Sequence, residues 1–151
     1  MFRNQKKLGE ILMAKGLITG EQLKSALDEQ RKTNEFLGTI FLKKNQIKEK
    51  DLLEGLSEQF NIPYVNLKYK YIDCQLAKQF SLALISDYKC FPITKDDWSI
   101  TVAITNPLDV WALKKAEERA GDLKLKFVLV SEEDMKEVIQ RYQQYIRHSI
   151  L

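Results

Sequence analysis

The chain has 151 residues, of which 44% are hydrophobic and 30% are charged. This composition is ordinary for a packed globular protein of one domain or two small subdomains, and it excludes an intrinsically disordered chain. The formal net charge of +3 is too small for the dense basic surface that is typical of nucleic-acid-binding proteins, so we expect no nucleic-acid partner.

Cysteine and histidine are too scarce to build a disulfide framework or a zinc site. The cysteines are Cys74 and Cys90, without CxxC spacing, and His148 is the single histidine. The N-terminal residues lack the apolar core of a signal peptide, and no apolar run is long enough to span a bilayer. We therefore expect a protein of the reducing cytoplasm with no metal, no disulfide and no membrane-spanning segment.

An internal duplication is the strongest pattern in the chain. Residues 7–30 are repeated by residues 36–59, and Gly38 stands 29 residues after Gly9. The same offset pairs Leu8 with Leu37, Ile11 with Ile40, Leu12 with Phe41, Ile18 with Ile47, Leu23 with Leu52, Leu27 with Leu56, and Gln30 with Gln59. Two such repeats, separated by the polar residues 31–35, are too few for a stacked repeat protein.

Each repeat is expected to form a hairpin of two short helices. In repeat one, apolar residues have helical spacing before and after a break at Gly16: first Leu8, Ile11 and Leu12, then Leu23, Ala26 and Leu27. Thr19 and Gln22 have the spacing of a capping box at the start of the second helix. Repeat two has Asn45 in place of Gly16, which keeps the helix stop, and Lys48 in place of Thr19, which removes the cap.

Two paired features are not explained by helix formation. Gly9 and Gly38 fall in first helical turns, where glycine costs up to ~1 kcal/mol relative to alanine, so we expect the close approach of another helix or of a ligand. Gln30 and Gln59 continue the apolar stripe at its edge. A single glutamine there would most simply hold the backbone of the following loop, whereas two at equivalent positions favour a symmetric polar site.

The remaining residues predict a small α/β structure. We expect, in order, a short strand over 64–67, a linker over 68–71, two short helices from Asp73 and Leu82, a hairpin of strands over 90–94 and 99–105, a helix from Asp109 to Gly121, a strand over 123–130 and a last helix after Ser131. The predicted fold class is α+β. A helical subdomain of two repeated hairpins, residues 1–67, is expected to pack on an α/β sandwich subdomain, residues 68–151.

No catalytic motif is present in the sequence. No glycine precedes a lysine as in the GxxxxGK[ST] phosphate-binding loop, and the HExxH and nucleophile-elbow patterns are absent. The acidic residues 132–134 fall in the first turn of the last helix, where the helix macrodipole explains them. We therefore predict a binding module, with no catalytic residue and no metal ligand, rather than an enzyme.

The duplicated residues resemble a known tandem motif. Lys7-Leu8-Gly9-Glu10 and its counterpart Leu37-Gly38, followed by Ile62-Pro63, Phe91-Pro92-Ile93 and Asn106-Pro107, are similar to the N-terminal domain of type II secretion and type IV pilus assembly ATPases, of the MshEN type. This resemblance extends over residues 7–142. It implies a regulatory domain, with the ATPase core as a separate C-terminal part.

Some members of this family bind cyclic di-GMP along the tandem motif, and others mainly dock on a membrane-anchored platform protein. The resemblance implies cyclic di-GMP as a candidate ligand, with the ligand-binding residues Lys7, Leu8, Gly9, Leu23, Leu27, Gln30, Phe36, Leu37, Gly38, Leu52, Leu56 and Gln59. The family pattern begins each repeat with Arg, where this chain has Lys7 and Phe36. The alternative is a docking domain that binds no nucleotide.

The resemblance also implies partners and a location. The partners would be the cytoplasmic domain of an inner-membrane platform protein of the secretion or pilus machine, and the ATPase core of the same protein. The location would be cytoplasmic, peripheral to the inner membrane through these partners.

Overall fold

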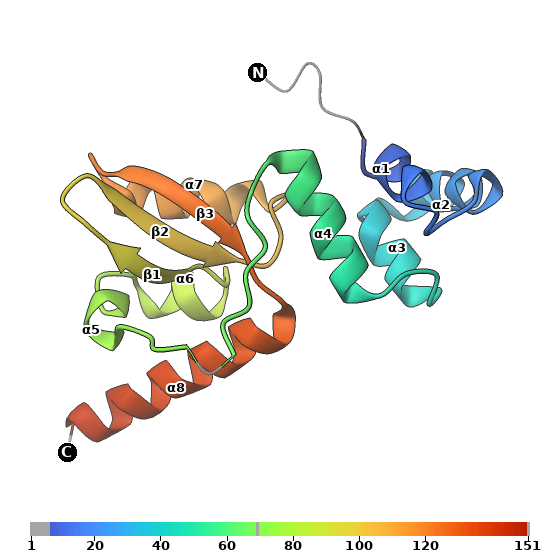
Figure 1. Cartoon of the computed structure of the whole chain (residues 1–151). Coiled ribbons are helices and arrows are strands. Elements are labelled where there is room, and N and C mark those ends of the chain that lie inside the picture. Colours follow the sequence, from blue (N-terminus) through green and yellow to red (C-terminus); the bar gives the residue numbers. More distant parts are fainter. Residues whose placement is uncertain (1–6, 69, 151) are drawn as a thin grey trace. The chain divides into compact units, whose positions relative to one another are not determined.

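The structure of the protein is a computed structural model that describes residues 7–68 and 70–150 (Figure 1). It divides into two compact parts, a helical subdomain, Met1–Asn61, and an α/β subdomain, Ile62–Leu151. The α+β fold class is confirmed, with helices alone in the described part of the first subdomain and a three-stranded sheet in the second. The boundary lies six residues before the expected one, because the segment after residue 61 hydrogen-bonds to the α/β subdomain.

The helical subdomain contains the two predicted hairpins. Repeat one forms α1 (Leu8–Ala14) and α2 (Gly20–Thr33), and repeat two forms α3 (Leu37–Lys43) and α4 (Glu49–Phe60). The predicted helix stops are confirmed, because Gly16 and Asn45 both have positive φ angles, 72° and 55°. Glycine and asparagine are the residues that most readily adopt this left-handed conformation.

The second helices of the two repeats, α2 and α4, begin differently because the residues at their starts differ. At α2, Thr19 and Gln22 form the predicted capping box, with N···O distances of 3.1 and 2.9 Å. At α4, the Lys48 side chain has no acceptor atom, so it cannot cap the helix. Asp51 nevertheless accepts a hydrogen bond from the backbone N–H of Lys48 at 3.2 Å, which preserves half of the box.

The two repeats pack on each other reciprocally, so that the first helix of each contacts the second helix of the other. Helix α1 packs against α4, and α2 packs against α3. Two ion pairs follow the same reciprocal arrangement: Lys15 lies 3.4 Å from Glu58, and Lys44 lies 2.8 Å from Glu29. Lys44 and Glu58 each stand 29 residues after Lys15 and Glu29, so interchanging the repeats converts one pair into the other. Each repeat therefore supplies half of the core around the other.

The α/β subdomain is built on a sheet with strand order β1-β2-β3. Strands β1 (Phe91–Lys95) and β2 (Ser99–Ile104) form the predicted antiparallel hairpin, and β3 (Lys124–Leu129) pairs with β2 in parallel after the crossover helix α7 (Val110–Ala120). Three further helices are α5 (Cys74–Ala77), α6 (Leu82–Ser86) and α8 (Glu132–Ile150). Figure 1 shows α7 on one side of the sheet and α5 and α8 on the other.

Both faces of the sheet are covered. Val102, Ala103 and Ile104 are consecutive residues of β2 and are all buried, although successive side chains of a strand point to opposite faces. On the α8 side, the ring of Phe91 meets the ring of Tyr142 edge to face, with centroids 6.0 Å apart. The sandwich predicted for this part of the chain is therefore a sheet between two helical layers.

The segment that follows α4 is bound to the α/β subdomain. Instead of the strand expected over 64–67, it forms one bridge between Tyr64 and Leu129. Beyond this bridge, the backbone N–H of Leu67 donates to the carboxylate of Asp134 at 2.8 Å. Arg141 donates to the carbonyl of Lys70 at 3.0 Å, and residue 69 of the expected linker lies outside the described residues.

None of the helices within residues 7–68 and 70–150 combines the length and the apolar character that crossing a bilayer requires.

Replacing Asp134 with alanine should destabilise the α/β subdomain. The change leaves the N–H of Leu67, whose side chain is buried, without its acceptor, and such a loss costs about 1–3 kcal/mol. Glu133→Ala is the matched control, because it removes a neighbouring carboxylate of the same helical turn that is exposed. Urea denaturation should show a larger loss for Asp134→Ala, and equal losses would contradict the anchoring role.

The Cys90 thiol should be unreactive in the folded protein. Its side chain is fully buried and lies 3.6 Å from the carbonyl of Ala112. Burial, and secondarily the charge of Asp109, raises the pKa of Cys90 from 9.0 to about 12, so almost no reactive thiolate exists at pH 8. A thiol-specific disulfide reagent should modify the half-buried Cys74 in the native state, and Cys90 only after denaturation. Equal rates at both thiols would contradict this prediction.

The same shift makes stability depend on pH. Between about pH 9 and 12 the unfolded chain loses the Cys90 proton while the folded chain keeps it, so the free energy of unfolding falls as pH rises. This group contributes about 1.4 kcal/mol per pH unit in that window. Comparing Cys90→Ala with the parent chain by denaturation at pH 8 and pH 10.5 isolates the contribution, since the variant should show the smaller decline.

Candidate ligand-binding site

The candidate site residues lie at the starts of α1 and α3 and along α2 and α4. Lys7 and Phe36 are the N-cap residues of α1 and α3, in extended conformation and without a side-chain cap. These two helices therefore begin in the same way, as the duplication predicts. Their first-turn N–H groups are left to water or to a ligand, because an α-helix offers them no internal acceptor.

The close approach predicted at the two glycines is confirmed, and the approaching group is a leucine of the same repeat. A Cβ atom on Gly9 would lie 2.6 Å from Cδ1 of Leu23, and one on Gly38 would lie 2.5 Å from Cδ1 of Leu52. Both distances are shorter than any normal carbon contact. Glycine in each first helix thus lets the leucine of the second helix pack against its backbone, and a larger residue would have to displace that leucine.

Gln30 holds the spacer between the repeats. Its Nε2 donates to the backbone carbonyl of Glu35 at 3.1 Å, immediately before Phe36. This is the simpler of the two interpretations of Gln30, and it also places the amide at the start of α3. Gln59 is half-buried at the equivalent place, but the counterpart of Glu35 is Lys6, which lies outside the described residues.

The site residues come together across the repeats. Gly55 of α4 lies beside α1, and a Cβ atom there would be 3.1 Å from Cδ1 of Leu8. Gln59 stands one turn further on the same face of α4, because residues four apart are neighbours on a helix. One group therefore joins the start of α1 to α4, and contains Lys7, Leu8, Gly9, Leu56 and Gln59. The other joins α2 to the start of α3, and contains Leu27, Gln30, Phe36, Leu37 and Gly38.

The two groups differ in what they expose. In the α2–α3 group, Leu27 is 37% exposed and Phe36 is 45% exposed. In the α1–α4 group, Leu56, the counterpart of Leu27, is buried, and Leu8 is buried where its counterpart Leu37 is half-buried; Lys7, the counterpart of Phe36, is exposed. The α2–α3 group therefore presents an apolar and aromatic surface, whereas the α1–α4 group is closed by its own packing.

An exposed, unpaired positive charge is found at the α1–α4 group and not at the α2–α3 group within the described residues. Next to the α2–α3 group, Lys43 is paired with Glu35 at 2.9 Å and Lys44 with Glu29 at 2.8 Å. Lys7, at the α1–α4 group, is exposed and forms no ion pair within the part of the chain that the structure describes. A ligand that spans both groups would meet an aromatic ring at one and a cation at the other.

The charged residues of the sequence contain a further signal of this arrangement, which the apolar pattern leaves out. Lys15 and Lys44 are both lysines at the repeat offset, and Glu29 and Glu58 are both glutamates. A lysine and a glutamate recur at the same two positions of both repeats, and in the structure each lysine pairs with the glutamate of the other repeat. Over residues 7–68 and 70–150, no group of His, Cys, Asp and Glu side chains is arranged to hold a metal ion.

The geometry defines a helical two-repeat module joined to a small α/β sandwich, which is the fold of the N-terminal domains of secretion and pilus ATPases. The chain belongs to the MshEN domain family, whose model matches residues 60–149. The matched residues cover the α/β subdomain and the end of α4. The duplication that carried the resemblance lies outside them.

Known relatives cover most of the chain. It is 29% identical over 136 residues to the type IV pilus assembly ATPase PilB of Myxococcus xanthus, which is 90% of this chain and 24% of that protein. It is 27% identical over 118 residues to PilB of Thermus thermophilus, which is 77% of this chain and 13% of that protein. The chain thus spans a quarter or less of these relatives.

Two solved structures have the same fold. The structure of MshE with cdg matches with a TM-score of 0.84 and 23% identity, over 91% of this chain and 99% of that one. The N-terminal domain of XpsE matches with a TM-score of 0.68 and 17% identity, over 91% and 97% of the two chains.

Gly9→Ala should destabilise the helical subdomain. The added methyl group would displace Leu23, and such overpacking costs about 1–3 kcal/mol, of which better helix propensity recovers at most ~1 kcal/mol. Gly20→Ala is the matched control, because a Cβ atom there has nothing closer than 3.9 Å, and it should be neutral or stabilising. Thermal unfolding distinguishes the two variants, and a similar gain from both would refute the packing role of Gly9.

Proposed function

We propose that this chain is the N-terminal regulatory domain of a type IV pilus assembly or type II secretion ATPase, and that its helical subdomain binds cyclic di-GMP. The observation that carries the proposal is the reciprocal packing of the two repeats, in which α1 packs on α4 as α3 packs on α2. The likeness to the structure of MshE with cdg, an abbreviation of cyclic di-GMP, supports the ligand. The likeness to two PilB proteins supports the ATPase, whose core would be a separate C-terminal part.

The symmetry of the subdomain suits a ligand with two identical halves. Cyclic di-GMP carries two guanines and two phosphates in a ring, so each half would meet one group of site residues. Phe36 offers an exposed face on which a guanine can stack, beside the exposed Leu27. Lys7 offers a positive charge for a phosphate.

The glutamines supply the polar edge of the proposed site. Gln30 uses one N–H of its amide to hold Glu35, and its Oε1 and second N–H make no other hydrogen bond to residues that the structure describes. Gln59 is half-buried at the equivalent position of α4. Both amides would pair with guanine edges or with phosphate oxygens, since an amide carries two donors and an acceptor oxygen.

A second candidate function is docking without nucleotide. The α/β subdomain exposes large side chains, with Trp98 at 82%, Trp111 at 68% and Val110 at 70%. Aromatic residues are enriched at protein interfaces. The partner would be the cytoplasmic domain of an inner-membrane platform protein, which would also hold the ATPase at that membrane.

Calorimetry of the whole chain with cyclic di-GMP tests the nucleotide proposal. Phe36→Ala should weaken binding roughly 5-fold to 100-fold, because stacking of a base on an aromatic ring contributes about 1–3 kcal/mol. Gln30→Ala and Gln59→Ala should each weaken it about 2-fold to 10-fold. Leu82→Ala and Gln140→Ala, at exposed positions of the α/β subdomain, are the controls and should bind like the parent chain.

Introducing the arginines of the family pattern should have the opposite effect on the affinity for cyclic di-GMP. Phe36→Arg and Lys7→Arg should tighten binding, because a guanidinium both stacks on guanine and donates two parallel hydrogen bonds. If calorimetry detects no heat of binding for the parent chain and for the arginine variants at high micromolar cyclic di-GMP, the proposal that this nucleotide is the ligand is rejected. Binding that survives both glutamine changes would instead reject the site assignment. A pull-down of the platform protein's cytoplasmic domain without nucleotide would support the docking function.

A further inference from the structure

Strand β3 has an outer edge that the described part of the chain pairs only at one end. It is the last strand in the order β1-β2-β3, and its other neighbour is the single bridge to Tyr64. At this bridge, the N–H of Val65 donates to the carbonyl of Leu129 at 2.9 Å, and the N–H of Leu129 donates to the carbonyl of Pro63 at 2.7 Å. The edge thus already accepts a parallel segment at Leu129.

Along a β-strand, the backbone N–H and C=O groups of successive residues point to opposite sides, so the groups that point to the outer side of β3 can be identified. Since the N–H and C=O of Leu129 point outward, those of Phe127 and Leu125 do so too. The N–H of Lys124 instead points inward, and donates to the carbonyl of Trp98 at 2.8 Å. No strand within residues 7–68 and 70–150 pairs with the outer side of Leu125 or Phe127. Two donors and two acceptors are therefore open to an added strand.

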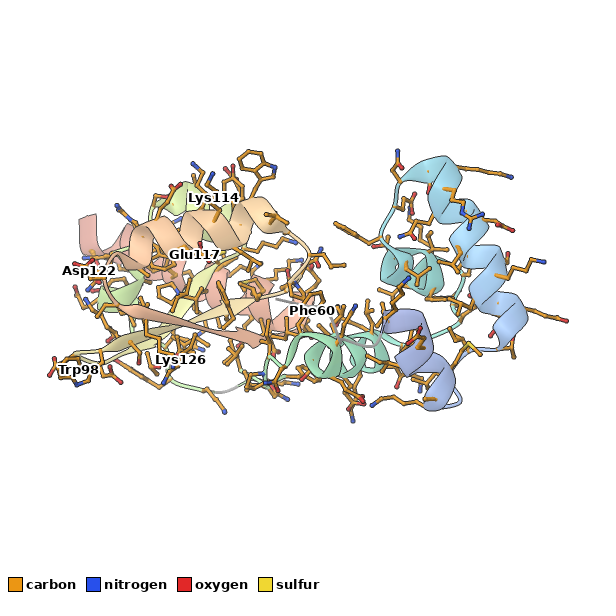
Figure 2. All side chains as sticks on the ribbon, turned by 90° about the horizontal axis from the view of Figure 1, so that it is seen from above. Phe60, Trp98, Lys114, Glu117, Asp122 and Lys126 are labelled. Atoms are coloured by element: carbon orange, nitrogen blue, oxygen red, sulfur yellow. The ribbon has the colours of Figure 1, made fainter. Side chains whose placement is uncertain are left out.

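The side chains beside this edge are basic. Lys124 and Lys126 are two residues apart, so they lie on the same face of β3, and both are exposed. Neither forms an ion pair in the part of the chain that the structure covers. Figure 2 shows Trp98 at the tip of the β1–β2 hairpin and Lys126 further along the sheet. Trp98 is 82% exposed and adjoins Lys124 on the β2 side of β3.

The two lysines decide which strand fits. If a second copy of β3 paired antiparallel at this edge, Lys124 and Lys126 of both copies would face one another, and like charges directly opposite are destabilising. A segment with carboxylates at alternate positions would instead place each carboxylate beside a lysine. We infer that the outer edge of β3 at Leu125 and Phe127 receives an acidic, extended segment of a partner protein as an added strand. This inference concerns the α/β subdomain alone and does not depend on nucleotide binding.

The test uses a capped peptide of about seven residues in which Glu alternates with Val, a length that covers an ordinary strand. Titrated into the isotopically labelled whole chain, it should shift the amide signals of Leu125 and Phe127 most. The double variant Lys124→Glu with Lys126→Glu should lower its affinity roughly tenfold or more, since two attractive cross-strand pairs become repulsive. The double variant Lys114→Glu with Lys115→Glu, the same charge change on α7, where Figure 2 labels Lys114, should leave the affinity within about twofold.

Two matched peptides separate charge from backbone pairing. The same peptide with Lys in place of Glu should bind at least tenfold more weakly. The peptide with N-methyl groups on the bonding side should lose binding, because it cannot donate to the carbonyls of Leu125 and Phe127. The inference is overturned if no peptide shifts these amides up to millimolar concentration, if the Lys peptide binds equally well, or if sedimentation shows that the edge is occupied by a second copy of the chain.

Discussion

The helical subdomain depends on the packing of each repeat's first helix against the second helix of the other repeat. Because α1 packs on α4 and α2 packs on α3, a single repeat has no complete core. This reciprocal arrangement is held by close packing at Gly55 and by the ion pairs of Lys15 with Glu58 and Lys44 with Glu29. Exposed ion pairs contribute little energy, so packing carries the stability, and the pairs match the two repeats in register. The same arrangement brings the start of each first helix beside a glutamine of the other repeat.

The α/β subdomain also binds the segment that connects it to α4. The bridge at Leu129 and the carboxylate of Asp134 together bind residues 63–67, so the backbone after α4 is an integral part of the second subdomain. Among residues 7–68 and 70–150, the segment covers the end of β3 alone, and Leu125 and Phe127 keep an edge, flanked by lysines, that no described strand pairs with. Lysines on such an edge discourage pairing between identical copies while leaving it open to a segment of opposite charge.

Family and ligand follow from different parts of the molecule. The family model matches residues 60–149, in which no candidate ligand-binding residue lies. The candidate site lies in the two repeats, where it consists of one exposed, aromatic group and one closed group that presents Lys7. Because the repeats differ at their first residue, the halves of a two-fold ligand would be bound by different chemistry.

Local patterns in the sequence were sufficient for most elements of the fold, although the strand expected over 64–67 is a single bridge at Tyr64. The helix stops at Gly16 and Asn45, the capping box at Thr19 and the β1–β2 hairpin depend on residues close together in the chain, so spacing predicts them. The duplication likewise predicted that equivalent residues serve equivalent roles, and each glycine does meet a leucine of its own repeat. Only the tertiary structure decided that site residues group across repeats and that residues 62–67 belong to the α/β subdomain. These features depend on contacts between distant residues, and a periodic pattern states which face of an element is buried without stating which partner buries it.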